Sequence, residues 1–264
     1  MRSVLITGSN GQLGISIKEL EKNYPDLKLL FCSSKELDIT NYHEVLRFFE
    51  ANKPDYCINC AAYTDVEQAE RKPEKAFLVN AEAVKNLAET CKSYKTILIQ
   101  VSTDYVFDGW KEEPYKVGDK TNPINQYGKS KLKGEAYIQE ILKEFFIVRT
   151  SWLYNKNHGK NFYRTVLEKA KKGEDLKITT EQTGCPTDTL NLARYLLNLI
   201  ENQDRKFGLY HFTDGVAMTW YDFAKKILIE NLLLDTAKLE KVKKYRTFAA
   251  RPVNSVLSLE KLPI

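Results

Sequence analysis

The sequence predicts an α/β protein: a doubly wound parallel sheet with a smaller, partly interleaved C-terminal lobe. Three observations lead to this prediction. Apolar strands alternate with amphipathic helices up to residue 152. These strands are apolar almost throughout, as strands covered by helices on both faces are. A glycine-rich turn joins the first strand to the first helix.

Strands and helices follow one another regularly in the first part of the chain. Each expected helix carries apolar residues at three- and four-residue spacing, as Leu13, Ile17 and Leu20 do in the first one. The strands are expected over 3–8, 27–33, 55–62, 95–107 and 145–152, and the helices between them over 11–23, 42–54, 81–94 and 130–144. Because a helix connects each pair of strands, we expect neighbouring strands to be parallel.

After residue 152 the alternation weakens. Three helices are expected there, over 161–175, 186–202 and 219–234. Side chains that cap helix N-termini mark two of the starts: Thr187 or Asp188 for the second helix, and Thr219 with Asp222 in a capping box for the third.

Composition bounds the class of protein. The chain has 264 residues, of which 43% are hydrophobic, and Lys and Arg exceed Asp and Glu by 40 to 35 without a long basic block. This surplus suits an anionic small molecule and is too small to indicate nucleic acid. No apolar run approaches the length of a membrane span, and the chain enters an apolar strand at once, without the regions of a signal peptide. We therefore expect a cytoplasmic protein that binds neither nucleic acid nor a membrane.

The cysteines are interpreted as core thiols. Cys57 and Cys60 form a C-x-x-C, but they lie in an expected strand, where residues three apart face opposite sides of the sheet. No second Cys or His pair at ligand spacing follows. We expect no bound metal.

The segment "ITGSNGQLG", residues 6–14, has the pattern of a dinucleotide-binding loop. Gly8 allows a sharp turn, Gly11 lets the backbone approach a diphosphate at the helix N-terminus, and Gly14 lets helix and strand pack closely. Because this triplet follows a strand and opens a helix, we expect a Rossmann-type domain over 1–152 that binds a nucleotide cofactor. A segment near 177–205 is expected to return to this domain, and 153–264 is expected to form mainly a substrate-binding lobe.

The end of the second strand bears on which cofactor binds. Rossmann domains that use NAD usually place an acid there to hold the ribose hydroxyls. This chain has Ser33, Ser34 and Lys35 instead, and hydroxyls with a cation suit the 2′-phosphate of NADPH. An ordinary polar turn would look the same, and Asp38, slightly later, could instead meet the adenine. NADPH is therefore favoured over NADH, with both kept open.

Three Tyr-x-x-x-Lys patterns are candidates for a catalytic pair, and context favours one. Tyr24 is followed by a proline that stops the helix, and Tyr221 lies on an amphipathic helix with no strand-end hydroxyl nearby in sequence. Tyr127 opens a helix after the strand that ends in Thr103, at the edge of the sheet where ligands bind. Lys131 lies one helical turn further on, on the same face.

The chemistry of this set is proton transfer. A free phenol has a pKa of about 10, and a neighbouring ammonium or a positively charged nicotinamide lowers it. Thr103 could hydrogen-bond either Tyr127 or a substrate oxygen. The group that reacts is then a carbonyl or an alcohol lying against a nicotinamide ring.

With these residues in place, the chain resembles an extended short-chain dehydrogenase/reductase, and within that group the dTDP-4-dehydrorhamnose reductases. The segment "AAYTDVEQAE", followed by "VNA", is similar to that family's third-strand loop. The other blocks occur in the family's order: "STDYVFDG", "NQYGKSKLKGE", "RTSWLY", "NF", "EQTGCPT", "GLYHF", "TWYDFA" and "RPVNSVL". The resemblance covers nearly the whole chain.

The resemblance implies a set of binding residues. It assigns Asn10, Gly11, Gln12 and Leu13 to the cofactor diphosphate, Asp38 and Ile39 to the adenine, and Ala61, Ala62 and Tyr63 to the ribose and nicotinamide side. Tyr127 and Lys131 would serve cofactor and catalysis, with Thr103 tuning the tyrosine, and Thr103, Asp104 and Trp152 would line the sugar pocket. Asn161, Arg251 and Asn254 are candidates for holding the diphosphate of a nucleotide sugar.

The implied activity is NAD(P)H-dependent reduction of the 4-keto group of dTDP-4-dehydro-β-L-rhamnose to dTDP-L-rhamnose. Two alternatives stay open: a reductase of a related nucleotide-linked keto sugar, and a non-catalytic dinucleotide-binding subunit like the regulatory β-subunit of methionine adenosyltransferase. Some members of the family dimerise through a metal held by acidic residues. The corresponding positions here are Ser16 and Leu190, so we expect a monomer or a homodimer without that metal bridge.

Overall fold

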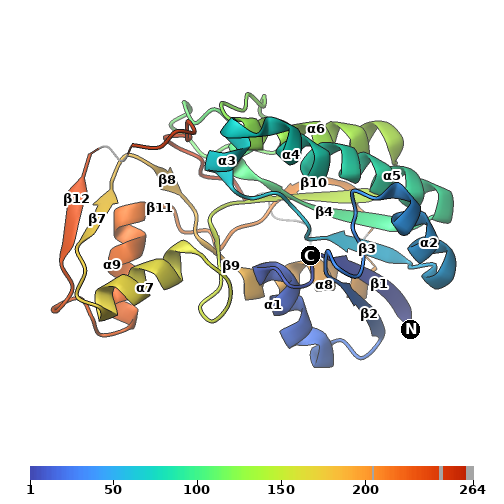
Figure 1. The fold of residues 1–264 in the computed structure, drawn as a ribbon, viewed down its shortest axis with the longest axis horizontal. Coiled ribbons are helices and arrows are strands. Elements are labelled where there is room, and N and C mark those ends of the chain that lie inside the picture. The colour runs from blue at the N-terminus through green and yellow to red at the C-terminus, as the bar shows by residue number, and fades with distance from the viewer. Residues whose placement is uncertain (204, 244–245, 260–264) are drawn as a thin grey trace.

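A six-stranded parallel sheet forms the centre of the larger of two lobes (Figure 1). The computed structural model describes residues 1–203, 205–243 and 246–259, and all counts and absences below refer to these residues. The sheet consists of β1 (Arg2–Thr7), β2 (Leu27–Cys32), β3 (Tyr56–Asn59), β4 (Ile97–Thr103), β5 (Phe145–Thr150) and β10 (Gly208–His211), in the spatial order β10-β5-β4-β3-β1-β2. This confirms the doubly wound parallel sheet.

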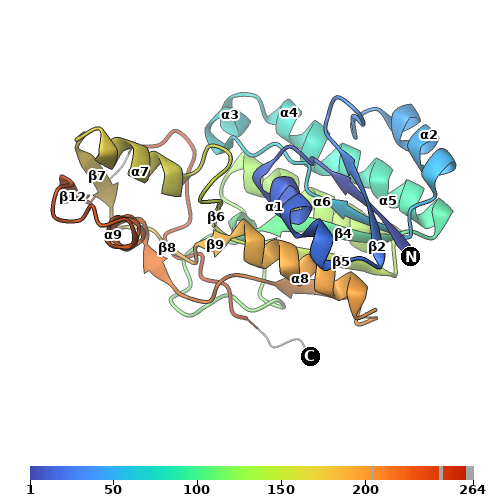
Figure 2. The same cartoon turned by 90° about the horizontal axis from the view of Figure 1, so that it is seen from below.

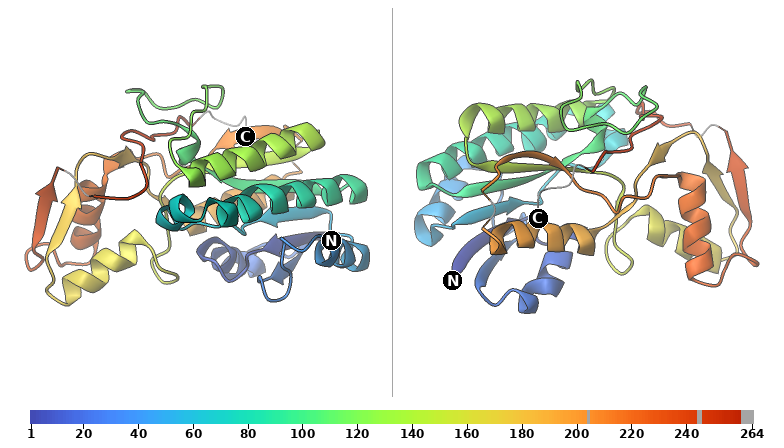
Figure 3. Two further views of the ribbon diagram at one scale, coloured as in Figure 1. Left: turned by 45° about the horizontal axis from the view of Figure 1, so that its top comes forward. Right: turned by 180° about the vertical axis from the view of Figure 1, so that it is seen from behind.

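Helices cover both faces of this sheet. The helices of this lobe are α1 (Gln12–Leu20), α2 (Tyr42–Asn52), α3 (Val66–Arg71), α4 (Pro73–Phe77), α5 (Ala83–Tyr94), α6 (Gln126–Ile141) and α8 (Thr189–Glu201). Figure 2 shows α1 and α8 side by side on one face, and Figure 3 shows α5 and α6 side by side on the other.

Two hydrophobic cores result from the two-residue period of the strands. Along β1, Val4 and Ile6 pack in the core beneath α1 and α8, whereas Leu5 packs in the core beneath α2, α5 and α6. All three side chains are fully buried. Burial on both faces explains why the strands are continuous apolar runs rather than alternating ones.

The sheet order places the expected ligand site. The chain runs from β1 outward to β2 and then crosses to β3 on the other side of β1, so the winding reverses between β1 and β3. In doubly wound sheets, ligands bind at the carboxyl ends of the strands beside such a switch point. Gly8, which follows β1, meets Ala61, which follows β3, at this point: a Cβ on Gly8 would come within 2.7 Å of the Ala61 nitrogen.

The smaller lobe has its own core. It contains α7 (Phe162–Lys171), α9 (Trp220–Glu230) and the parallel pair β7 (Leu176–Thr179) and β12 (Leu239–Val242). Two further pairs lie along the chain between and beside the lobes: β8 (Thr183–Gly184) with β11 (Met218–Thr219), and β6 (Leu153–Tyr154) with β9 (Thr187–Asp188). Phe223 and Ile227 of α9 pack in this lobe's core against residues of α7.

The structure refines the expected boundaries. The segment that returns to the larger lobe consists of α8 and β10, at 189–211, whereas β7, which we expected within a return near 177–205, belongs to the smaller lobe. Asp188 is the cap of α8, and the Thr219–Asp222 capping box opens α9 as predicted. The short helices α3 and α4 and the π-helical turn Leu78–Glu82 were not predicted as elements.

Cys57 and Cys60 lie on opposite sides of the sheet, as expected from their spacing. Cys57 is buried in the core beneath α2, α5 and α6, and Cys60 packs against the core beneath α1 and α8. Burial raises the pKa of the Cys60 thiol far above its ordinary value. Within the described part of the chain, no helix is both long enough and apolar enough to cross a membrane, and no cluster of three metal-ligating side chains occurs.

Candidate active site

A ladder of buried polar side chains crosses the carboxyl ends of three neighbouring strands. The Thr7 hydroxyl of β1 donates to Asn59 Oδ1 of β3 at 2.6 Å, and the Asn59 amide donates to Gln100 Oε1 of β4 at 2.8 Å. Each of these groups is at least 97% buried and finds its partner on the adjacent strand. The ladder therefore fixes the relative positions of the strand ends that carry the glycine loop and the catalytic candidates.

Lys131 joins this ladder from α6. Its Nζ donates to the Val101 carbonyl at 2.7 Å, and the Gln100 amide donates to the same oxygen at 2.8 Å. Lys131 is almost fully buried, and desolvation lowers the pKa of its ammonium to about 8, against the opposing effect of Glu135. The ammonium is thus still charged at neutral pH and loses its charge as the pH rises through about 8.

Tyr127 lies beside the end of β4. Asn125 caps α6 by accepting from the Gly128 amide at 2.7 Å, which places Tyr127 in the first helical turn. Burial raises the pKa of the Tyr127 phenol far above 10, and a hydrogen bond with the Thr103 side chain opposes that rise. The structure places Tyr127 beside Thr103 and Lys131 one helical turn further along α6; their catalytic roles stay predictions.

Asp104 follows Thr103 directly and is buried. The Thr103 hydroxyl donates to Asp104 Oδ1 at 3.1 Å and accepts from the Tyr105 amide at 3.2 Å. Burial raises the pKa of the Asp104 carboxyl to about 7, although hydrogen bonds from Ser255 and Thr103 lower it. Oδ2 of this carboxyl has no hydrogen-bond partner among the described residues.

A buried ion pair between α6 and β5 supports the site. It was not predicted from the sequence. Arg149 of β5 holds Glu135 of α6 through Nη2 at 2.6 Å and Nε at 3.0 Å, and the Ser102 hydroxyl donates to the same carboxylate. Glu135 is one helical turn beyond Lys131. The pair therefore fixes α6 against the strand that ends in Thr103. The one signal of this ion pair in the sequence is a charged residue at a position that is expected to face the core.

Asn80 is a second group that sequence reasoning missed. Its side chain accepts from the Tyr63 amide at 2.9 Å and donates to the Tyr63 carbonyl at 3.0 Å and to Ser130 of α6 at 3.0 Å. The loop after β3, expected to border the nicotinamide, is thereby tied to the helix that carries Tyr127. Only the resemblance noted around "VNA" pointed toward this segment.

The glycine loop has the shape expected of a phosphate cradle. Gly8 has φ +62°, in the left-handed region that glycine favours, and a Cβ on Gly14 would come within 2.5 Å of Ser9. Gly11 caps α1, and no described side chain satisfies the first-turn amides of Gln12 and Leu13. Such a helix start suits the diphosphate of a dinucleotide, which fits the predicted role of this loop. Asn10 is exposed beside it.

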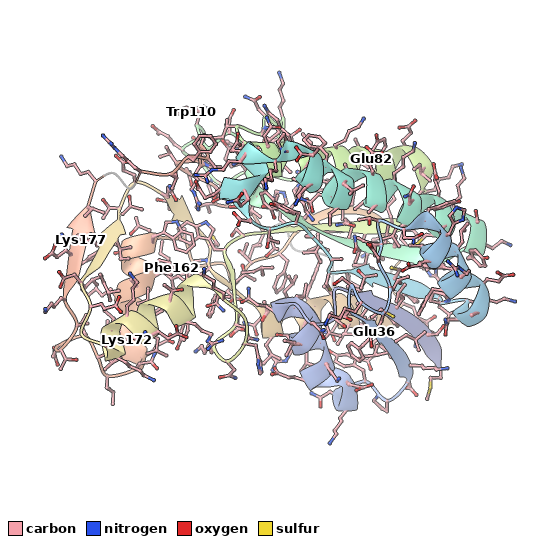
Figure 4. All side chains as sticks on the ribbon, viewed as in Figure 1. Glu36, Glu82, Trp110, Phe162, Lys172 and Lys177 are labelled. Atoms are coloured by element: carbon pink, nitrogen blue, oxygen red, sulfur yellow. The ribbon has the colours of Figure 1, made fainter. Side chains whose placement is uncertain are left out.

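The end of β2 departs from the expected arrangement. Ser33 is buried and its amide donates to Glu36 Oε2 at 2.7 Å, while Lys35 is exposed. The hydrogen bond from the Ser33 backbone lowers the pKa of Glu36, so this group is an anion at neutral pH. A carboxylate thus lies among the residues that we assigned to a 2′-phosphate. Figure 4 shows Glu36 on the larger lobe near β1 and β2.

The residues assigned to the adenine and the nicotinamide side lie in loops after β2 and β3. Asp38 is exposed and accepts from the Thr40 amide at 2.9 Å, whereas the Ile39 side chain is buried in the core beneath α2 and α5. Ala61, Ala62 and Tyr63 are partly buried, and the Ala61 amide points to Asn59 Oδ1 at 3.2 Å. Their contacts with a cofactor stay predictions.

Trp152 lies at the junction of the lobes. It has φ +47°, an uncommon backbone conformation for an indole-bearing residue, and its ring stacks on Trp220 with centroids 3.5 Å apart and planes 4° apart. A Cβ on Gly184 would come within 2.5 Å of the Trp152 ring. Phe162 of α7, labelled in Figure 4, packs against the other indole at 4.5 Å. Trp220 and Phe162 extend the aromatic surface beyond the single tryptophan we predicted.

The three residues assigned to a substrate diphosphate are already hydrogen-bonded or ion-paired to other residues of the protein. Asn161 caps α7 and donates to Gln12 Oε1 at 2.7 Å, which connects the smaller lobe to the glycine loop. Asn254 donates to the Lys111 and Glu112 carbonyls. Arg251 pairs with Glu67 at 2.8 Å, and its Nε is buried without a partner among the described residues. Of the three, Arg251 keeps a donor for a ligand.

The competing tyrosines lie elsewhere. Tyr24 is buried under α8 and donates to Asn198 Oδ1 at 2.7 Å. Tyr221 lies on α9 in the smaller lobe, where Lys241 lies 4.9 Å from its ring centroid. Neither is within a hydrogen bond of the strand-end polar ladder in the described structure. The selection of Tyr127 as the catalytic tyrosine stays a prediction.

Ser16 belongs to a buried neutral cluster. Its hydroxyl lies 2.7 Å from the Thr189 hydroxyl, and the Asn155 amide donates to both at 3.0 Å. Thr189 opens α8 and precedes Leu190, so the cluster joins α1 to α8. Two hydroxyls and an amide thus join these helices.

Comparison with known proteins identifies the family of this chain. The model of the RmlD substrate binding domain family matches residues 1–263. A dTDP-4-dehydrorhamnose reductase of Aggregatibacter actinomycetemcomitans is 38% identical over 99% of this chain and 92% of its own length. The crystal structure of a dTDP-4-dehydrorhamnose reductase from Bacillus anthracis in complex with NADP is 35% identical, with a TM-score of 0.94 over 98% of this chain and 92% of that one. A dTDP-4-dehydrorhamnose reductase structure from Clostridium acetobutylicum is 38% identical, with a TM-score of 0.91 over 97% of this chain and 90% of that one. This chain belongs to the RmlD substrate binding domain family.

Proposed function

We propose that this protein is an NAD(P)H-dependent oxidoreductase that reduces the 4-keto group of dTDP-4-dehydro-β-L-rhamnose to give dTDP-L-rhamnose. The observation that carries the proposal is the grouping at the end of β4: Tyr127 in the first turn of α6 beside Thr103, which lowers the pKa of its phenol, with the buried Lys131 one turn further along α6. The family membership and the dTDP-4-dehydrorhamnose reductases at 34–38% identity support the substrate class.

Tyr127 is suited to donate a proton. Because burial raises the pKa of its phenol, the proton is still on the oxygen when a substrate arrives. Donation leaves a phenolate, which the nearby ammonium of Lys131 and the N-terminus of α6 both stabilise. Thr103 lowers the pKa of the phenol by donating its hydroxyl hydrogen bond to the phenolate. The three groups thus favour proton transfer from Tyr127 to a developing sugar alkoxide.

The fit of a dinucleotide cofactor rests on the glycine loop. Glycines at 8 and 14 stand where a Cβ would collide with backbone, and the open amides of Gln12 and Leu13 offer donors to a diphosphate. When bound, the nicotinamide supplies the hydride that the carbonyl carbon receives. Asn80 holds the Tyr63 loop against α6 on the side where that ring is expected.

The aromatic junction supports a deoxysugar substrate. Trp152 and Trp220 present stacked apolar faces near the glycine at 184, and such faces suit the apolar side of a sugar ring. Arg251, with its unpartnered Nε, is the group we assign to the substrate phosphates.

The test is NADPH oxidation by the purified protein with dTDP-4-dehydrorhamnose as substrate. Tyr127→Phe removes the donated proton and keeps the ring, so we expect kcat to fall by about 10²–10⁴-fold. Tyr221→Phe is the matched control: it removes the same atom from the same Tyr-x-x-x-Lys spacing and should retain full activity. Absence of substrate-dependent oxidation in the unmutated protein would disprove the activity, and an active Tyr127→Phe variant would disprove the assigned donor.

A further inference from the structure

Asp104 is a buried carboxyl group that the proposed reduction does not yet use. It is 2% exposed, lies in the 3-10 turn Asp104–Val106 after β4, and its Oδ2 has no hydrogen-bond partner among the described residues. An uncompensated buried carboxylate is costly, so such a group tends to hold a proton. A carboxyl that is kept without a full set of partners therefore calls for a functional explanation.

The Thr103 hydroxyl connects this carboxyl to the phenol. It lies 3.1 Å from Asp104 Oδ1, and it is near enough to the Tyr127 phenol to lower the pKa of that group. A hydroxyl has one proton and two lone pairs, so it can donate to only one of these neighbours at a time while it accepts from the other. When one neighbour is ionised, the hydroxyl proton points to it and the protonated neighbour donates to the hydroxyl oxygen.

We propose that Asp104 is the proton reservoir of the site, returning a proton to Tyr127 through the Thr103 hydroxyl after each reduction. This rests on the proposed function, in which each turnover moves one proton from Tyr127 to the sugar oxygen. In the return step the Thr103 O–H bond breaks as a Tyr127 O–H bond forms. The Asp104 O–H bond breaks as a new Thr103 O–H bond forms, and the carboxylate then takes one proton from water.

The charges around Asp104 are consistent with this role. Tyr105 on the same turn, Tyr127 on α6 and Cys185 after β8 are the titratable groups that interact with it. Burial raises the pKa of all three, so each is neutral near pH 7 and places no charge beside Asp104 there. The pKa of the Asp104 carboxyl, about 7, lets it exchange its proton at that pH. Arg251 and Glu67 face Tyr105 and form an ion pair with each other. A carboxyl that titrates near 7 is well matched to give and regain a proton at neutral pH.

Asp104→Asn tests the relay because it preserves the shape and the Oδ1 acceptor and removes the exchangeable proton. Tyr127 begins protonated in this variant, so a first turnover at the unmutated rate should consume one equivalent of NADPH per site. Steady-state kcat should then fall by about 10–100-fold, with a new solvent deuterium isotope effect. Asp235→Asn, on the smaller lobe, is the control and should match the unmutated protein.

Two outcomes would overturn the relay. If Asp104 serves only to bind the sugar, the first turnover slows as much as later ones, or KM rises while kcat is unchanged. Both patterns differ from failure of the proposed function, in which the unmutated protein itself shows no substrate-dependent oxidation.

Ser255→Ala keeps the proposal testable if Asp104→Asn does not fold. Ser255 lowers the pKa of Asp104 by hydrogen bonding to its charged form, so the variant should move the fall of kcat with rising pH upward by about one pH unit. Carbon-13 NMR of the aspartate carboxyls should show the same shift without any substrate, starting from a group that titrates near 7. If neither the pH dependence of kcat nor the titration of the Asp104 carboxyl shifts in Ser255→Ala, the relay is contradicted.

Discussion

The N-termini of α6 and α9 are locally the same and functionally different. In each, a side chain caps the helix by accepting from the third helical amide, a tyrosine is the second helical residue, and a lysine follows four positions later. Tyr127 and Lys131 nevertheless lie at the end of β4 among buried polar groups, whereas Tyr221 lies beneath a lysine ammonium on the smaller lobe. Spacing sets which side chains share a helix face, and only the surroundings of that face make them reactive.

The surroundings differ most at the eighth position after each tyrosine. In α6 this residue is Glu135, buried in the ion pair with Arg149, and in α9 it is Ile229, which is 53% exposed. α6 is therefore anchored to the sheet by a charged group, whereas the corresponding position of α9 carries no charge and α9 packs in the smaller core through apolar side chains such as Phe223 and Ile227.

The largest expected effect is on stability, from breaking this anchor. Glu135→Ala leaves the Arg149 guanidinium buried without its partner, so we expect the free energy of unfolding to fall by about 3–5 kcal/mol in urea denaturation. Ile229→Ala, the corresponding change in α9, should alter it by less than about 0.5 kcal/mol. The double variant Glu135→Leu with Arg149→Met should recover much of the loss, because no unpaired charge remains. Equal losses at the two positions would contradict the comparison.

Removing the lysines comes next. Lys131→Met deletes the ammonium that stabilises the Tyr127 phenolate, so kcat should fall by about 100-fold, whereas Lys225→Met should leave it unchanged. Lys131→Arg keeps the charge at all accessible pH values. In the unmutated protein, kcat should fall in part because Lys131 loses its proton near pH 8. In Lys131→Arg this part of the fall should be absent. If kcat depends on pH in the same way in Lys131→Arg as in the unmutated protein, ionisation of Lys131 does not cause the fall.

The smallest effect concerns the two caps. Asn125→Ala and Thr219→Ala each remove one acceptor from a helix start, so each should lower the unfolding free energy by about 1 kcal/mol. Only Asn125 also donates to the Ala250 carbonyl and positions Tyr127, so only its variant should lose kcat as well. Thermal unfolding and NADPH oxidation, measured on both variants, separate these two effects. Equal losses of kcat would refute the distinction between the two helix starts.

Local patterns were sufficient to predict most elements. The helices α1, α2, α5, α7, α8 and α9 and the strands β1 to β5 occur where hydrophobic spacing predicted them, and the caps Asp188 and Thr219 were identified by residue type. The short helices α3 and α4 and the strand β10 escaped prediction. They have too few turns or residues to show a period, and their stability comes from contacts with distant segments.

The reactive residues of the proposed site could be selected from the sequence, whereas the groups that support them could not. Tyr127, Lys131 and Thr103 could be chosen because a strand end and a glycine turn are recognisable in sequence. Asn80, Arg149 and Trp220 act through partners that are 14 or more residues away in the chain, and nothing local distinguishes them. Glu36 shows the same limit. We interpreted the residues before it as a phosphate site, but the Glu36 carboxylate accepts a hydrogen bond from the Ser33 amide among them.

The sequence by itself determined the class of fold, the phosphate loop and the short list of tyrosines, because periodicity and glycine positions act over a few residues. Only the tertiary structure decided which groups surround each tyrosine, which lysine is buried, and which acid is left short of partners. Those properties depend on burial and on hydrogen bonds between segments far apart in the chain, and burial is what moves the pKa values on which the chemistry depends.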